Sequence, residues 1–203
     1  MFIKICGITN LDDALASVAA GADALGFNFY GPSPRYVKPS EARKMIEQLP
    51  ANVLKVGVFV NEATPQRVRD IAADAGVTAL QLHGDESPEY CAALADNYVI
   101  KVISLHREDV DSYKVTALMV DSGDKHMRGG TGKIVDWSAA AKLARHVPRL
   151  FLAGGLSPEN VEEAIVQVRP YAIDVCSSVE QKPGRKDHDR LRAFVKKARS
   201  VKP

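Results

Sequence analysis

The chain has 203 residues, of which 46% are hydrophobic and 26% are charged, and its formal net charge is +2. This composition is ordinary for a globular protein, and a chain of this size buries enough surface to fold without a disulfide or a metal. No long run of one charge sign occurs, which excludes the concentrated basic face that nucleic acids or anionic membranes require. We therefore expect no nucleic-acid or membrane partner.

The three cysteines are Cys6, Cys91 and Cys176. Their odd number and the lack of a CxxC pair argue against a disulfide framework and against a zinc site. The amino terminus runs directly into apolar sequence without the pattern of a signal peptide, and no stretch of about 18 apolar residues occurs. We expect a cytoplasmic protein in which residues 1–203 form one domain.

Short apolar runs recur from one end of the chain to the other, separated by segments with a helical pattern. The runs are continuous rather than alternating, as expected for parallel strands that are covered on both faces. They span residues 2–8, 24–30, 54–60, 79–84, 99–105, 117–122, 150–154 and 172–177.

The intervening segments carry helix start and stop signals. Thr64 followed by Pro65 predicts an N-cap with proline at the first helical position, and Gly76 predicts the end of that helix. The Ser-Pro pairs at residues 87–88 and 157–158 predict two further helices that begin in the same way.

Eight strand–helix units at about 25 residues each favour an α/β fold of the closed (β/α)₈ or TIM-barrel class, close to its lower size limit. The alternative is an open doubly wound sheet, which usually has fewer strands. A GxGxxG loop after the first strand would favour that alternative, and this sequence has none.

In a (β/α)₈ barrel, the functional residues lie at the carboxyl ends of the strands and in the loops that follow. Those positions are polar here and include Cys6, Arg35, His83, Asp121 and Asp174. Each has an ordinary structural alternative, such as a buried cysteine, a loop histidine or an aspartate that caps a loop. Their convergence on one rim of the barrel favours a functional site.

Two loops have the pattern of phosphate binders. Gly154 and Gly155 lie at the end of the seventh strand, and Ser177 and Ser178 follow the eighth. Barrel enzymes commonly bind phosphate at these loops with backbone N–H groups. A further glycine-rich loop at residues 129–133 is not a Walker A loop, because Met127 and Ile134 occupy two required positions. Its place after Asp121 predicts a cover over the site, with Gly130 as another phosphate ligand.

Taken together, these motifs resemble the phosphoribosylanthranilate isomerase family of tryptophan biosynthesis. The similarity follows the whole chain in order, in the motifs KICGIT (4–9), GFNFY (26–30), SPRY (33–36), VGVFVN (56–61), QLHG (81–84), VDS (120–122), GGTGK (129–133) with DW (136–137), AGGL (153–156) and PGRKD (183–187). One departure follows the eighth strand: the family pattern resembles DVSSGVE, whereas residues 174–180 read DVCSSVE. Ser178 therefore replaces a glycine of the expected phosphate loop.

The resemblance implies an Amadori rearrangement of N-(5-phosphoribosyl)anthranilate to 1-(2-carboxyphenylamino)-1-deoxyribulose 5-phosphate. It implies Asp121 as general acid, Cys6 as general base, and Arg35 as the partner of the anthranilate, with His83 and Asp174 orienting the substrate. The chemistry requires a raised pKa for the acid and a lowered pKa for the thiol. We expect no cofactor and no metal, a small phosphorylated substrate as partner, and a monomer or a homodimer.

The resemblance assigns no catalytic role to Cys91 or Cys176. The nearest rival enzyme is an indole-3-glycerol-phosphate synthase-like lyase, which needs a lysine acid that residues 58–61 do not provide. A related sugar isomerase would have an aspartate in place of Cys6. From a different class, the chain could be a non-catalytic phosphate-binding barrel or a fragment of a larger assembly.

Overall fold

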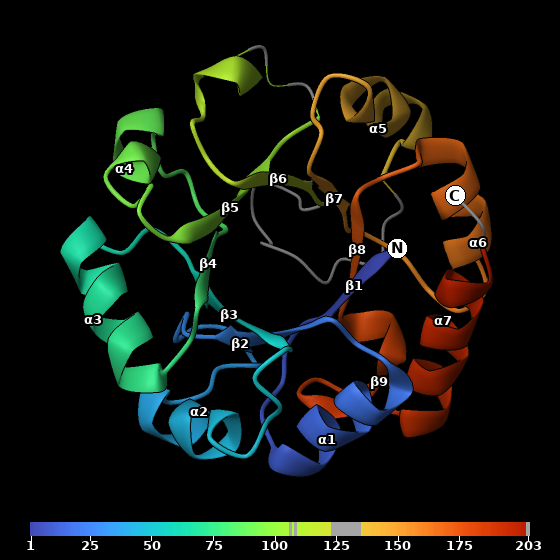
Figure 1. Ribbon diagram of the computed structural model, residues 1–203, viewed down its shortest axis with the longest axis horizontal. Coiled ribbons are helices and arrows are strands. Elements are labelled where there is room, and N and C mark those ends of the chain that lie inside the picture. The colour runs from blue at the N-terminus through green and yellow to red at the C-terminus, as the bar shows by residue number, and fades with distance from the viewer. Residues whose placement is uncertain (106, 108, 123–134, 202–203) are drawn as a thin grey trace.

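A computed structural model of the protein describes residues 1–105, 107, 109–122 and 135–201. Eight parallel strands form a closed barrel in sequence order, with β1 paired to β8, so the predicted barrel is confirmed and the open sheet is wrong (Figure 1). The strands are β1 (Phe2–Ile5), β2 (Ala24–Asn28), β3 (Leu54–Phe59), β4 (Ala79–Leu82), β5 (Tyr98–Ile103), β6 (Ala117–Val120), β7 (Leu150–Leu152) and β8 (Ala172–Val175).

The helices form a ring outside the strands (Figure 1). They are α1 (Leu11–Ala20), α2 (Pro39–Ile46), α3 (Pro65–Ala75), α4 (Pro88–Ala92), α5 (Trp137–Ala144), α6 (Val161–Val168) and α7 (His188–Ser200). Between β8 and α7 the chain adds a 3₁₀ turn, η2 (Ser177–Val179), and a small antiparallel hairpin of β9 (Glu180–Lys182) and β10 (Arg185–Lys186). In the described part of the chain, no helix is long and apolar enough to cross a membrane.

The helix signals are mostly confirmed. The Thr64 hydroxyl accepts the Arg67 N–H at 3.1 Å at the start of α3, and Gly76 ends this helix with a left-handed φ of 76°. The Ser-Pro pair at residues 87–88 begins α4, a helix of only five residues.

The helix start predicted at residues 157–158 is wrong, because α6 begins at Val161. The reason is the side chain of Asn160. Its oxygen accepts the Ser157 N–H at 2.8 Å, and its amide nitrogen donates to the Gly155 carbonyl at 2.9 Å. Residues 157–160 are therefore used to hold the loop after β7 in place.

All eight predicted strands are present, and each ends before its predicted run does. The residues left over at the carboxyl ends include Cys6, His83 and Asp121. These side chains therefore belong to the loops at the barrel mouth.

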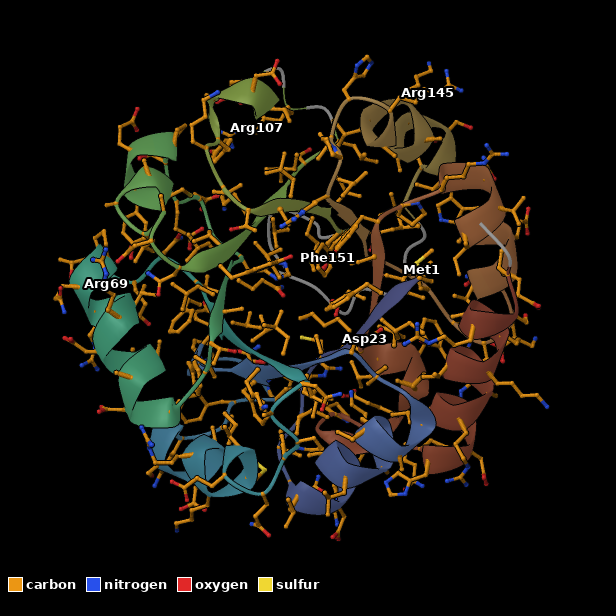
Figure 2. All side chains as sticks on the ribbon, viewed as in Figure 1. Met1, Asp23, Arg69, Arg107, Arg145 and Phe151 are labelled. Carbon is orange, nitrogen blue, oxygen red and sulfur yellow. The ribbon has the colours of Figure 1, made fainter. Side chains whose placement is uncertain are left out.

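The barrel interior has an apolar layer of mostly small side chains around two large ones, Met119 and Phe151. Phe151 is fully buried and lies within the ring of strands (Figure 2). A larger apolar cluster comes from the outward-facing strand residues and the helices that cover them. Beyond the inner layer, towards the carboxyl ends, the inward-facing residues become polar, with Lys4, Gln81 and Asp174 all buried.

Candidate active site

The loops that follow β6, β7 and β8 surround a cavity at the carboxyl ends of these strands. It is lined by Asp121, Ser122, Ala153, Gly154, Gly155, Leu156, Asp174, Val175, Cys176, Ser177 and Ser178. The structure thus brings together six residues that the sequence assigned to one site: Asp121, Asp174, Gly154, Gly155, Ser177 and Ser178. Gly130 lies outside the described residues.

Gly154 and Gly155 have backbone conformations that favour glycine, with φ values of 81° and 70°. A β-carbon on Gly154 would lie 2.4 Å from the Ser122 backbone nitrogen. The loop after β7 therefore passes directly against the loop after β6, which requires a residue without a side chain. This close approach brings the glycine loop to the side of the cavity where Asp121 lies.

Ser178, which replaces the expected glycine, ties two loops together. Its hydroxyl donates a hydrogen bond to the Leu156 carbonyl, and Arg190 Nε donates to the Ser178 carbonyl at 2.8 Å. The hydroxyl is thus used between the loops after β7 and β8. The donors that these loops can offer to a phosphate are therefore their backbone N–H groups.

A buried ion pair lies at the base of the site. Lys4 Nζ donates to Asp174 Oδ1 at 2.7 Å, and these two residues are direct neighbours on β1 and β8. Burial raises the pKa of Asp174 to about 7, against the opposing charge of Lys4. For Lys4, burial opposes the charged form, but Asp174 and Cys6 together raise its pKa. Lys4 is therefore a fixed positive charge beside Cys6.

Cys6 has the electrostatic surroundings of a thiolate. A hydrogen bond from Cys176 and the charges of Lys4 and Lys186 lower its pKa well below the usual range, despite its burial. Lys186 Nζ also donates to the Cys6 carbonyl at 2.6 Å. Glycine at position 26 makes room for the thiol, because a β-carbon there would lie 2.8 Å from Cys6 Sγ.

On the opposite side of the barrel mouth, His83 faces Asp121, with 3.5 Å between His83 Nε2 and Asp121 Oδ2. Burial lowers the pKa of His83, so the ring is neutral at physiological pH. Gln81 Nε2 lies 3.1 Å from His83 Nδ1. With the Gln81 amide nitrogen as the donor to Nδ1, the ring proton is on Nε2, on the side of the carboxylate.

Arg35 forms a two-pronged ion pair with Glu180, the first residue of β9. Arg35 Nε lies 3.0 Å from Glu180 Oε1, and Arg35 Nη2 lies 2.8 Å from Oε2. Lys186 Nζ contacts the same carboxylate at 3.0 Å. Although burial opposes ionisation, these two cations lower the pKa of Glu180. The guanidinium is therefore placed to hold a carboxylate, and in this structure it holds one from the chain itself.

Sequence reasoning assigned no role to Lys4, Glu180 and Lys186. A signal for Lys4 existed, since a lysine in the middle of an apolar strand must find a partner in the barrel. Glu180 and Lys186 lie in short segments that were noticed only as part of the family pattern. Their convergence on Cys6 and Arg35 depends on the β9–β10 hairpin, which the sequence did not predict.

A closed barrel with ionisable side chains and a glycine loop at the carboxyl ends of its strands defines a (β/α)₈-barrel enzyme. The family model for N-(5'-phosphoribosyl)anthranilate (PRA) isomerase matches residues 3–197. The chain belongs to this family, and it is an isomerase of tryptophan biosynthesis. The family assignment favours the isomerase over the lyase alternative.

The chain is similar to known isomerases along nearly its whole length. The isomerase of Thermotoga neapolitana is 48% identical, with 98% of each chain covered. The phosphoribosyl anthranilate isomerase structure from Thermotoga maritima has a TM-score of 0.91 at 43% identity and covers 99% of this chain and all of its own. A third structure, of an isomerase in complex with reduced 1-(o-carboxyphenylamino)-1-deoxyribulose 5-phosphate, has a TM-score of 0.87 at 42% identity, covering 99% of this chain and 100% of its own.

Proposed function

We propose that the barrel mouth isomerises N-(5-phosphoribosyl)anthranilate with Asp121 as general acid and Cys6 as general base. The observation that carries this proposal is the acidified thiol of Cys6 on one side of the mouth with the Asp121 carboxyl on another. Both groups act electrostatically on Asp174 and on His83. We infer that one substrate at the mouth contacts both groups.

The first step needs a proton on the furanose ring oxygen. Asp121 in its protonated form donates it, the ring opens, and the substrate nitrogen becomes a Schiff base. The Nε2–H of His83 then faces the carboxylate that remains and stabilises its negative charge. His83 is thus a positioning residue for the acid.

In the second step the Cys6 thiolate removes the C2′ proton, and the electron pair moves towards the protonated imine to give an enolamine. Lys4 and Lys186 favour the thiolate before this transfer. Tautomerisation of the enolamine gives the ketone product. The carboxyl group of Asp174, whose pKa of about 7 allows both protonation states, orients the sugar hydroxyls.

The phosphate of the substrate fits the loops after β7 and β8. Backbone N–H groups around Gly154, Gly155, Ser177 and Ser178 supply the donors, and we propose Gly130 as a further one. A related isomerase binds the reduced, phosphorylated product, which supports a phosphorylated ligand for this family of barrels.

The anthranilate carboxylate is the proposed partner of Arg35. It takes the position of the Glu180 carboxylate on the guanidinium, and Glu180 keeps its contact with Lys186. Arg35 and Lys186 would then each face one carboxylate, whereas without substrate both contact Glu180.

For the chain as a whole, we propose one catalytic domain over residues 1–203 that acts in the cytoplasm on its small phosphorylated substrate. Both a monomer and a homodimer are compatible with this site, which one chain completes. A relative from Thermotoga maritima is described as dimeric.

The direct test of the activity is to follow the fluorescence of phosphoribosylanthranilate with purified protein and to identify the product by mass spectrometry after reduction. We expect catalytic loss of the substrate and a product of unchanged mass that borohydride reduces. Loss of fluorescence with release of free anthranilate would instead indicate hydrolysis and contradict the proposal.

A further inference from the structure

A second cysteine lies beside the proposed base. Ile5 of β1 and Val175 of β8 are direct neighbours in a parallel pair, so the next residues, Cys6 and Cys176, are adjacent at the barrel mouth. The Cys6 N–H donates to the Val175 carbonyl at 2.9 Å, which continues the pairing to this point. Neighbouring strands lie about 4.8 Å apart, within the range of about 4.4–6.8 Å that α-carbons joined by a disulfide span.

The two side chains also lie on the same face. Lys4 and Asp174, two residues earlier on the same strands, meet inside the barrel at 2.7 Å. Since side chains alternate along a strand, Cys6 and Cys176 both turn inward as well. Cys176 Sγ lies against the segment that follows β1, because a β-carbon on Gly7 would lie only 2.9 Å from it. Each thiol is also the strongest influence on the pKa of the other, as expected for two sulfurs that lie within reach of each other.

Cations surround this pair of thiols, and solvent reaches it. Lys186 Nζ lies 4.0 Å from Cys176 Sγ, and the charges of Lys4 and Lys186 act on Cys6. Cys6 and Cys176 are both half-buried, and Cys176 lines the open cavity. A thiolate in a cationic, accessible setting is the form of cysteine that oxidants attack.

Cys91 provides the contrast within the same chain. It is fully buried in α4, and burial raises its pKa to about 11. An apolar, buried thiol of this kind is inert to oxidants. Reactivity should therefore be confined to the barrel mouth.

We propose that Cys6 and Cys176 form a redox-active thiol pair in which a hydroperoxide oxidises Cys6, Cys176 closes a disulfide, and the isomerase is reversibly switched off. The pairing rests on the geometry of β1 and β8 alone. The loss of activity rests on the proposed function, because it follows only if Cys6 is the base.

The chemistry proceeds in two balanced steps. The Cys6 thiolate attacks one oxygen of the hydroperoxide, the O–O bond breaks, and the products are a sulfenic acid on Cys6 and an alkoxide or hydroxide that takes a proton. Cys176 sulfur then attacks the Cys6 sulfur, the S–O bond breaks, and the leaving hydroxide combines with the thiol proton as water. Glu180 Oε1, 3.8 Å from Cys176 Sγ, is placed to accept that proton on its way. Two external thiols reverse the oxidation by disulfide exchange.

The test is to treat the reduced protein with hydrogen peroxide and to measure intact mass, alkylatable thiols and activity together. We expect a mass loss of about 2 Da with two thiols protected, and a cross-linked peptide that joins Cys6 to Cys176. Activity should fall on the order of 10²-fold or more and return with dithiothreitol, because a positioned base contributes at least that factor. A gain of oxygen on Cys6 while Cys176 stays alkylatable would overturn the proposal.

Two variants sharpen the result. For each, the activity after oxidation is compared with the activity of the same variant before oxidation. Cys176→Ser should over-oxidise at Cys6 to the sulfinic acid, a gain of about 32 Da, and dithiothreitol should not restore it. Cys91→Ala, the matched control, should form the disulfide and recover like the unchanged protein. Full recovery of Cys176→Ser would contradict the role of Cys176. Disulfide formation without loss of activity would support the pairing of Cys6 with Cys176, but it would show that Cys6 is not the base.

Discussion

The inside of this barrel has two layers with opposite chemistry. The lower layer packs small side chains around Phe151 and Met119, whereas the layer at the carboxyl ends contains Lys4, Asp174 and Cys6. Both are built by the same inward-facing positions of the strands. The lower layer gains stability by removing apolar surface from water. The upper layer buries ionisable groups at a cost in stability. There, burial raises the pKa of Asp174 to about 7, and the neighbouring thiol and cations lower the pKa of Cys6, so both shifts favour acid–base chemistry.

The largest effect should come from the lower layer. Phe151→Ala leaves a cavity in the centre of the barrel and should lower the free energy of unfolding by about 3–5 kcal/mol. Because Phe151 is not among the residues that line the cavity, kcat of the folded protein should stay near its original value. Denaturant unfolding and kcat on the same preparation check this. A large loss of kcat without loss of stability would mean that the two layers are not separate.

At the mouth, Arg35→Ala should raise KM strongly, because the anthranilate carboxylate loses a charge-assisted partner worth about 1.5–3 kcal/mol. The affinity for ribose 5-phosphate, which carries the phosphate and lacks the carboxylate, should change little. Arg35→Lys is the matched control. It should recover only part of the loss, since lysine keeps the positive charge but lacks the planar guanidinium that binds a carboxylate through two hydrogen bonds. Equal weakening of both ligands would place Arg35 in the phosphate site instead.

The ionisable groups of the upper layer should also make the free energy of unfolding depend on pH. Asp174 has a folded-state pKa of about 7, above its ordinary value near 3.9, so the folded protein binds a proton that the unfolded chain releases. Its contribution therefore favours folding at low pH and is lost as pH rises from about 4 to 7, with a slope of at most about 1.4 kcal/mol per pH unit.

The double variant Lys4→Met/Asp174→Asn removes this titration together with the buried pair. Its free energy of unfolding should change less between pH 4 and 7 than that of the unchanged protein. Urea unfolding across this range measures the difference. Identical slopes would show that Asp174 titrates in the folded state as it does in the unfolded chain.

The smallest effect concerns the outer ring of helices. Thr64→Ala removes the N-cap of α3 and should cost about 1 kcal/mol of stability with kcat and KM unchanged. Thr64→Ser, which retains the hydroxyl, is the control. A change in KM would connect this helix end to the site.

The sequence predicted the barrel well, because strand and helix signals are local. Apolar runs and the cap at Thr64 depend on neighbours a few residues away. The helix start at residues 157–158 was wrong because the Asn160 side chain, three residues further on, holds the segment as a turn.

The candidate site was predicted less completely for a different reason. Residues such as Cys6 and Asp121 could be named from their positions, but their surroundings depend on contacts between distant segments. Lys4 and Asp174 are 170 residues apart, and only closure of the barrel between β1 and β8 joins them. The acidity of Cys6 likewise depends on Cys176 and Lys186, near the other end of the chain.

The central claim is that Asp121 and Cys6 transfer the two protons, and the most direct measurement is kcat of Cys6→Ser and of Asp121→Asn beside product affinity and thermal stability. Serine raises the pKa of the base far out of range, and asparagine cannot donate the proton. We expect kcat to fall about 10²–10⁴-fold in each variant, with product affinity and Tm nearly unchanged. A stable, folded variant of either kind with near-normal turnover would contradict the account.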